Sequence, residues 1–191
     1  MINHNLERYI GIIVGLSILV CIILTIIHDN LRILSLKIFI GDISTTISVV
    51  SILCVAFISW AWKWKIFRNW LVPFPCISGK WEGTLVSTFD NEKKEIPITV
   101  SISQNFFNVQ IRIKTEESTS NSTCASFDID GNRGLKQLLY SYQNNPKATI
   151  RDRSEIHYGT ARLEINDDAT FLEGEYWTTR KTTGEISIHK I

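Results

Sequence analysis

The run Tyr9–Ile27, YIGIIVGLSILVCIILTII, contains no charged residue and no histidine. A second run of the same kind, Ile43–Trp62, follows after a short loop. At about 1.5 Å of rise per helical residue, each run spans roughly 28–30 Å, close to the thickness of the hydrocarbon core of a bilayer. A charged side chain at the centre of such a helix would cost roughly 2.5–3.5 kcal/mol. The two runs therefore predict a transmembrane hairpin over residues 1–70.

A cleaved signal peptide is the alternative for the first run. Its flank, Asn5–Arg8, is only weakly basic, and the apolar stretch is longer than the core of a typical signal peptide. The residues Ile27–Asn30 offer no cleavage site of small residues. We therefore expect the first helix to be retained.

Cations and aromatic residues alternate directly after the second run: Lys63, Trp64, Lys65, Phe67, Arg68 and Trp70. Cations at a membrane surface favour the cytoplasmic side, where the lipids are anionic, and indole rings favour the interface. This pattern predicts that both termini face the cytoplasm.

A short linker follows the hairpin, at residues 71–76, and it contains Pro73 and Pro75. Proline blocks the continuation of a helix and stiffens the chain. We expect one further domain over residues 77–191.

The pattern of this domain has a period of two. Apolar residues alternate with polar ones in two series, Ile96, Ile98, Val100, Ile102 and Phe107, Val109, Ile111, Ile113. Such alternation marks strands with one buried face. Six further strands are expected at 79–87, 118–130, 135–143, 157–166, 170–179 and 184–191, separated by turn signals such as Asn144-Asn145-Pro146. Within the third of these, Leu135, Leu138, Leu139 and Tyr142 also fit helical spacing.

About eight short strands without intervening helices predict an antiparallel, up-and-down β-barrel of the lipocalin-like kind. Closure of the barrel removes the exposed sheet edges, and a barrel of eight strands can hold one small ligand in its mouth. The fold class is therefore a membrane protein with an N-terminal two-helix hairpin and an all-β barrel.

Composition argues against several classes of function. From Lys80 onward the chain has 14 Lys and Arg against 16 Asp and Glu, so it lacks the basic face of a general DNA or RNA binder. The cysteines Cys76 and Cys124 are far apart and suggest neither a zinc site nor a disulfide framework. No catalytic motif, metal cluster or cofactor motif is recognisable. We expect a sensor or effector, not an enzyme.

The order of two spanning helices, short linker and barrel resembles the membrane effectors of CBASS, the cyclic-oligonucleotide-based anti-phage signalling systems. Five strings carry the resemblance: Gly79-Lys80-Trp81-Glu82-Gly83, Thr115-x-x-Ser118-x-Ser120, Tyr140-x-Tyr142-x-Asn144-x-Pro146, His157-x-Gly159-Thr160 and Leu172-x-Gly174-x-Tyr176-Trp177-Thr178-x-Arg180-x-Thr182-x-Gly184.

The resemblance implies a mechanism. The barrel would bind a cyclic dinucleotide made by a partner nucleotidyltransferase. The effector would then oligomerise and disrupt the bacterial inner membrane, which kills the infected cell. From the lack of motifs noted above, we expect no catalytic residue, no metal and no cofactor.

One expected strand carries a candidate ligand face. If Leu172 and Gly174 face inward, so do Tyr176, Thr178 and Arg180. Arginine can bind a phosphate with two hydrogen bonds, threonine can donate one, and tyrosine can stack on a base. A core aromatic for Tyr176 and a solvated turn cation for Arg180 are the alternatives.

Two other segments add candidates. Tyr142 shares a strand face with Tyr140, and Asn144 lies just beyond them; His157 shares a face with Gly159. Each could equally be a structural residue of the barrel. The expected ligand-binding set is Tyr142, Asn144, His157, Tyr176, Thr178 and Arg180.

Two further alternatives remain open. The barrel could be a membrane-tethered, lipocalin-like carrier of an apolar ligand, although its polar upper lining favours the receptor. The GxxxG motif at Gly11–Gly15 permits close helix contact, either between protomers or within one hairpin.

Overall fold

The computed structural model describes residues 2–30, 36–68, 70–88, 94–131 and 133–191. The chain divides into two compact units, Met1–Pro73 and Phe74–Ile191, and each is described by itself.

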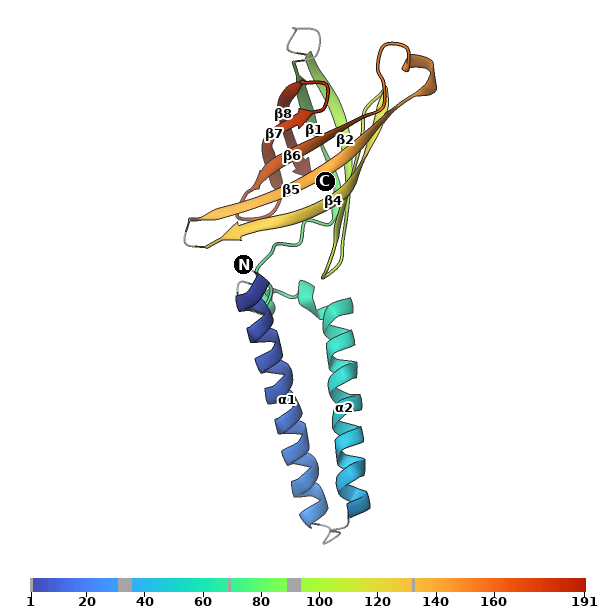
Figure 1. The fold of residues 1–191 in the computed structure, drawn as a ribbon. Coiled ribbons are helices and arrows are strands. Elements are labelled where there is room, and N and C mark those ends of the chain that lie inside the picture. The colour runs from blue at the N-terminus through green and yellow to red at the C-terminus, as the bar shows by residue number, and fades with distance from the viewer. Residues whose placement is uncertain (1, 31–35, 69, 89–93, 132) are drawn as a thin grey trace. The chain divides into compact units, whose positions relative to one another are not determined.

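The first unit is a helical hairpin (Figure 1). Helix α1 covers Ile2–Asn30 and helix α2 covers Leu36–Ser59. Within them, residues 7–27 and 40–59 are long and apolar enough to cross a bilayer. The second helix ends earlier than its apolar run predicts. Beyond Ser59 the chain tightens into two 3₁₀ turns, η1 (Ala61–Lys63) and η2 (Lys65–Phe67).

Each helix shields one row of residues at a spacing of four. The rows are Ile12, Leu16, Val20 and Leu24 on α1 and Asp42, Thr46, Val50 and Cys54 on α2. Residues four apart lie on one helix face, so these rows form the contact within the hairpin.

Two hydrogen bonds close the hairpin at one end. The Tyr9 hydroxyl donates to the Leu71 carbonyl at 2.6 Å, and the Arg8 guanidinium donates to the Trp70 carbonyl. The start of α1 and the chain after α2 therefore lie at the same end of the hairpin.

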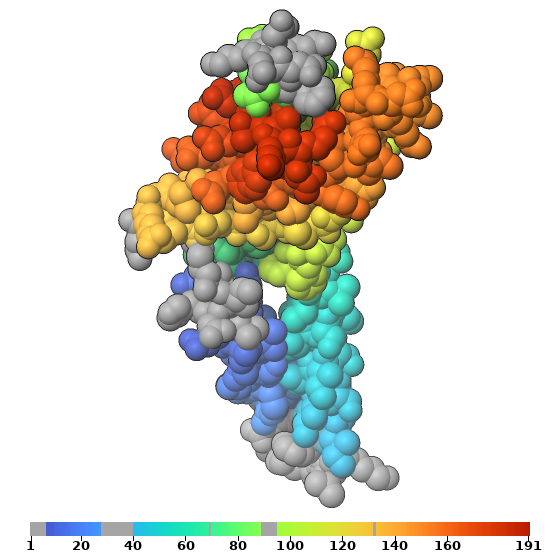
Figure 2. Space-filling view, turned by 45° about the horizontal axis from the view of Figure 1, so that its top comes forward, coloured from blue at the N-terminus to red at the C-terminus, as the bar shows by residue number. Residues whose placement is uncertain are grey.

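The second unit is a closed eight-stranded antiparallel barrel in which each strand pairs with the next and β8 returns to β1. This confirms the predicted fold class. The strands are β1 (Gly79–Ser87), β2 (Lys94–Gln104), β3 (Val109–Lys114), β4 (Ser118–Asp130), β5 (Leu135–Pro146), β6 (His157–Ile165), β7 (Phe171–Thr178) and β8 (Thr183–Lys190). In Figure 2 the side chains of β5 to β8 form a continuous outer wall.

The alternating residues become the core as the period of two predicts. Val100, Ile111 and Ile113 face inward and are buried, whereas Arg112 between them is exposed. The prediction that every apolar residue of the second series faces the core was wrong for one residue. Phe107 is 70% exposed in the turn before β3, because the tight turn from Asn105 to Asn108 starts the strand only at Val109.

The ambiguous segment after Leu135 is a strand, and it runs further than predicted. The expected turn Asn144-Asn145-Pro146 belongs to β5, where these residues pair with Ser120, Thr119 and Ser118 of β4. Proline is tolerated because it is the last residue of the strand, where a missing N–H costs little.

Trp81 fills one end of the barrel. It is fully buried, and its indole N–H donates to the Ile77 carbonyl at 3.0 Å. Ile77 is fully buried beside it. We call this end the floor and the opposite end, where β1, β3, β5 and β7 finish, the rim.

Candidate functional site

All six predicted ligand residues lie at the rim. Strand register explains this, because Asn144 stands opposite His157, Tyr142 opposite Gly159, and Gly159 opposite Thr178. Residues from β5, β6 and β7 are thereby brought together although they are far apart in sequence.

The turn between β7 and β8 presents Arg180. The Thr178 amide donates to the Thr182 carbonyl at 2.9 Å, and their hydroxyl oxygens are 2.7 Å apart. Lys181 has a φ of 61°, in the left-handed region that closes tight turns. The Thr178 hydroxyl also accepts the Arg180 amide at 3.2 Å. Thr178 therefore positions the turn that carries the guanidinium.

Arg180 is half-buried and not a freely solvated turn cation. Its guanidinium donates to the Ser154 hydroxyl at 3.2 Å, which ties the turn to the connection between β5 and β6. Its charge also acts on Tyr142, Tyr176 and His157, and it favours the deprotonated form of each. The four side chains thus form one electrostatic cluster.

Tyr142 and Tyr176 pack closely against glycines of the neighbouring strands. A Cβ added at Gly159 would come within 2.5 Å of the Tyr142 ring, and one at Gly184 within 2.5 Å of the Tyr176 ring. Each tyrosine therefore covers a glycine on the neighbouring strand. A tyrosine ring is a group that can stack with a nucleobase.

Burial raises the pKa of both tyrosines. It is the main cause in each case, and the hydrogen bond between Tyr176 and Ser87 opposes it, as does the charge of Arg180. Both hydroxyls are therefore protonated at neutral pH and can donate a hydrogen bond to a ligand oxygen.

Asn144 holds a polar network on β4. Its amide nitrogen donates to the Ser118 hydroxyl at 3.0 Å and to the Ser120 hydroxyl at 2.9 Å. The Ser118 hydroxyl is in turn 3.1 Å from that of Thr115. Hydroxyls and an amide in a row can exchange partners with the polar edge of a ligand.

His157 is buried at the start of β6. Burial is the main cause that lowers its pKa; the charge of Arg180 acts in the same direction, and a hydrogen bond to the Glu155 carbonyl opposes both. The imidazole is therefore neutral at neutral pH, and a bound anion would favour its protonation.

Sequence reasoning assigned no site role to Ser87 and Ser154, and it left Tyr140 undecided. The first two are ordinary serines that register and loop closure bring to Tyr176 and Arg180. Tyr140 is fully buried, and its ring centroid lies 5.9 Å from that of Tyr142. Its hydroxyl has no hydrogen-bond partner among the described residues. The serines carry no signal in the sequence that could have marked them.

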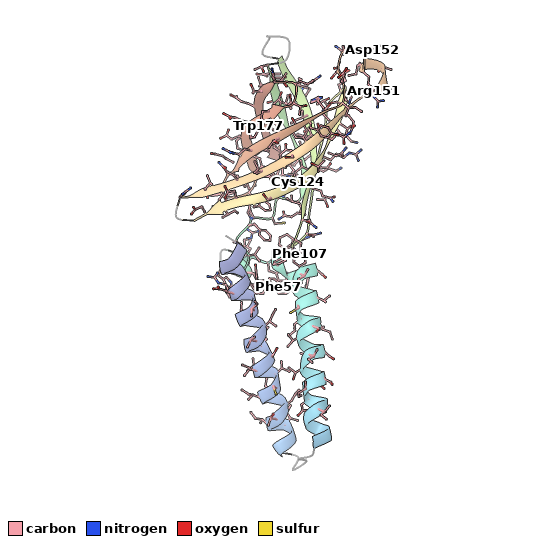
Figure 3. The ribbon with its side chains drawn as sticks, in the orientation of Figure 1. Phe57, Phe107, Cys124, Arg151, Asp152 and Trp177 are labelled. Carbon is pink, nitrogen blue, oxygen red and sulfur yellow. The ribbon has the colours of Figure 1, made fainter. Side chains whose placement is uncertain are left out.

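The connection between β5 and β6 adds charge beside the rim. It carries the exposed cations Lys147, Arg151 and Arg153, and Arg151 and Asp152 mark its tip in Figure 3. Arg153 pairs with Glu117 at the start of the neighbouring hairpin. Exposed cations of this kind attract an anionic ligand at long range.

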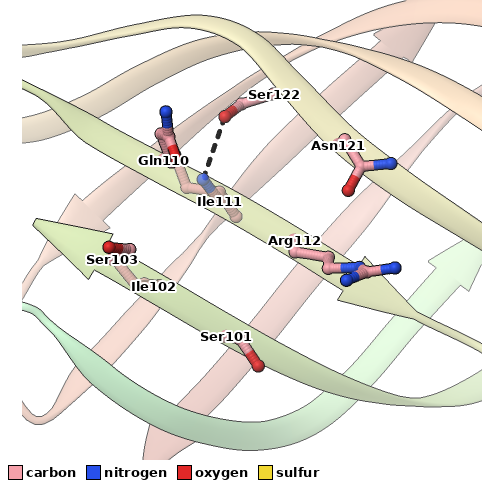
Figure 4. A pocket seen from close by; sticks show the side chains of 8 residues that line it. All are labelled: Ser101, Ile102, Ser103, Gln110, Ile111, Arg112, Asn121 and Ser122. Carbon is pink, nitrogen blue, oxygen red and sulfur yellow. Dashed lines mark hydrogen bonds between the residues drawn. The ribbon is translucent and has the colours of Figure 1, made fainter.

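Two grooves lie on the outside of the wall. One of about 450 Å³ runs over β2, β3 and β4, where Ile111 donates its amide to the Ser122 hydroxyl at 2.9 Å (Figure 4). The other, of about 340 Å³, lies beside the exposed aromatic side chains Tyr158 and Trp177. The second groove is also lined by Tyr142 and Thr178, whereas the lining of the first includes none of the six rim residues.

Comparison with known proteins identifies relatives. Residues 72–190 match the family described as "Cap15, cyclic dinucleotide receptor domain". The chain is 35% identical over 153 residues to CD-NTase-associated protein 15 of Staphylococcus schleiferi, which covers 80% of this chain and 81% of the relative. It is 36% identical over 94 residues to the protein of the same name from Yersinia aleksiciae, over 48% of this chain and 44% of that relative. The family match contains every rim residue described above.

Proposed function

Because the chain belongs to the family of CD-NTase-associated protein 15, a CBASS effector family with a cyclic dinucleotide receptor domain, we propose that the barrel rim binds a cyclic dinucleotide and that binding drives oligomerisation and disruption of the inner membrane. The observation that carries the proposal is the strand register that gathers Tyr142, Asn144, His157 and Thr178 at the rim, beside the turn in which Thr178 holds Arg180.

The rim matches the chemistry of such a ligand. A cyclic dinucleotide has two phosphates and two base faces. Arg180 can hold a phosphate with charge-assisted hydrogen bonds, and the rings of Tyr142 and Tyr176 can stack on bases. His157 can gain a proton beside a phosphate, and Asn144 can bond a base edge.

The barrel interior supports a receptor over a carrier of apolar ligands. Toward the floor it is filled by its own side chains, among them Trp81, Leu163 and Ile188, which are at most 1–2% exposed. A lipid-sized ligand would have to displace this packed core. A ligand held at the polar rim would not.

The open face of α1 supports an oligomer. Gly11 and Gly15 are exposed, and a Cβ added at either would meet nothing within 4 Å. Among the described residues, nothing in the hairpin therefore packs into the notch formed by Gly11 and Gly15. Small residues at this spacing let two helices approach closely in a bilayer. We place the contact between protomers at this notch.

The closed end of the hairpin supports the proposed topology. Tyr9 and Leu71 are joined there, and Lys63, Lys65 and Arg68 lie close in sequence. Cations on one side favour the cytoplasm, so both termini and the barrel would face the compartment in which a nucleotidyltransferase releases its product.

The test is binding followed by permeabilisation. The barrel is titrated with a panel of 3′,3′-cyclic dinucleotides that covers all pairs of the four bases, and the full chain is then exposed to the tightest binder in dye-loaded vesicles. We expect binding by one or few members and dye release only with the full chain. Absence of binding by every member would refute the receptor, and binding without release would refute the membrane step.

A further inference from the structure

The barrel wall has one short seam. Strands β3 and β4 pair over three residue pairs, Arg112 with Asn121, Ile113 with Ser120 and Lys114 with Thr119, whereas every other neighbouring pair of strands matches six or more. From Ser122 onward, β4 remains paired with β5 but is no longer paired with β3. The two strands β4 and β5 form a ribbon that extends beyond the barrel in Figure 1. The wall therefore has its fewest backbone bonds between β3 and β4.

A segment from before the barrel fills this seam. The Phe74 ring stacks on Phe127 of β4 with centroids 5.6 Å apart and planes at 3°. It also meets Phe106, in the turn before β3, at 5.7 Å. Phe74 thus bridges the two sides of the seam where the backbones do not pair.

Gln104 fixes the residues that follow. Its side-chain amide donates to the Pro75 carbonyl at 3.0 Å and accepts the Ile77 amide at 2.8 Å. The chain from Phe74 to Ile77 is therefore held to the barrel at both ends. This short stretch is also the covalent link to the hairpin, because Pro73 ends the helical unit.

We propose that Phe74 is a latch that holds the link to the hairpin in the resting conformation, and that ligand at the rim releases it. The proposal rests on the proposed function. Strand β4 carries both Phe127 and, at its rim end, the Ser118 and Ser120 hydroxyls that bind Asn144. A ligand that engages this network acts on the strand against which Phe74 is seated.

The latch is a two-state element. Phe74 is either seated on Phe127 or withdrawn, and a ligand shifts the balance only by its different affinity for the two states. Loss of the seat must then favour the withdrawn state even without ligand. A stacked aromatic pair is worth about 1 kcal/mol beyond its buried area, so its loss together with the buried area corresponds to roughly a tenfold shift.

The experiment uses the full-length protein in phosphatidylethanolamine–phosphatidylglycerol vesicles loaded with a self-quenched dye. We expect Phe74→Ala to release dye without nucleotide and to need about tenfold less of the active 3′,3′-cyclic dinucleotide than the wild type. Phe127→Ala should act in the same direction, and the double variant should add nothing to Phe74→Ala, because removal of the Phe74 ring already abolishes its stack on Phe127. Phe107→Ala is the control, since Phe107 is 70% exposed and its ring meets Phe106 edge-on, outside the Phe74–Phe127 stack.

The latch would be overturned if Phe74→Ala needed as much dinucleotide as the wild type, or more, and released no dye without nucleotide. Additive effects in the double variant would also overturn it. If Phe74→Ala does not unfold cooperatively, Phe74→Leu replaces it, because leucine keeps an apolar side chain but loses the stacking. If dye release by Phe74→Leu needs the same dinucleotide concentration as the wild type, the proposal is also overturned. If no dinucleotide opens the wild type, the proposed function fails, while nucleotide-free release still decides the latch.

Discussion

Arg180 is the residue on which the rim depends. Replacing it with alanine removes the guanidinium that donates to Ser154 and whose charge acts on Tyr142, Tyr176 and His157. A charge-assisted hydrogen bond to phosphate is worth about 1.5–3 kcal/mol, so Arg180→Ala should weaken dinucleotide binding roughly 10- to 100-fold. Calorimetric titration measures this.

Lys181→Gln is the matched control for Arg180. It removes the same charge one residue away, but Lys181 is exposed. Its affinity should stay within about twofold of the wild type, because an exposed charge contributes little. Equal losses in both variants would show that Arg180 acts only through net charge.

His157 should make barrel stability depend on pH. Its folded pKa lies below the usual value, mainly because of burial. The unfolded chain therefore binds more protons between the folded pKa and about 6.5, and stability falls as pH decreases through that window. His157→Gln should remove this part of the slope in melts from pH 7.5 to 5.5. An unchanged slope would mean that the imidazole already titrates normally in the folded barrel.

The same residue should couple binding to protons. A phosphate beside His157 favours its charged form and raises its pKa, so binding should take up protons and strengthen as pH falls toward 6. Calorimetry in two buffers of different ionisation enthalpy measures the uptake. Its persistence in His157→Gln would assign it to another group.

At the scale of elements, β5 and β6 fix the position of Tyr142. A Cβ at Gly159 would lie 2.5 Å from the Tyr142 ring and 2.9 Å from the Trp177 carbonyl. Gly159→Ala should therefore push the ring inward, with a loss of about 1–3 kcal/mol in stability and weaker nucleotide binding. Gly131→Ala, at a turn where a Cβ meets nothing within 4 Å, should change neither in thermal melts and titrations.

Helix α1 offers the second test at this scale. Because a side chain at Gly15 meets nothing within the protomer, Gly15→Leu should leave the hairpin and membrane insertion intact. If protomers meet at this notch, the variant should lose oligomers on cross-linking and lose killing, while binding persists. Val14→Leu, at an exposed neighbour, is the control. Oligomers that survive Gly15→Leu would place the contact elsewhere.

At the scale of the molecule, the barrel should fold without the hairpin, because about 115 residues suffice for one core. The contacts in the structure indicate that an isolated barrel should begin at Phe74 and not at Ile77. A chain of residues 74–191 keeps the Phe74 stack and the Pro75 carbonyl that Gln104 binds, whereas residues 77–191 lose both. Both should give β-type circular dichroism, with the longer chain melting at a higher temperature. A non-cooperative melt of residues 74–191 would contradict an autonomous barrel.

Topology is tested on the whole chain. A reporter that is active only in the cytoplasm, fused after Ile191, should be active, and a periplasmic reporter at the same point should not. The opposite result would remove the barrel from the compartment of an intracellular signal and refute the proposed orientation.

The sequence alone determined the hairpin and the barrel. Both follow from local periodicity: uncharged runs long enough to cross a bilayer, and alternation such as that of Ile98, Val100 and Ile102. It also predicted that Tyr142 and Tyr176 point inward, and both are buried in the barrel, because side chains two apart on a strand share a face. The ends of the strands do not follow from periodicity: β5 runs through Pro146, beyond the predicted end at residue 143, because its last residues pair with β4.

Only the tertiary structure decided which of these residues meet. Register brings Tyr142 over Gly159 and Tyr176 over Gly184, and loop closure brings Ser154 to Arg180. The short β3–β4 seam and the Phe74 ring within it are likewise absent from any local pattern. They result from contacts between residues distant in sequence, whose energies depend on geometry that periodicity does not encode.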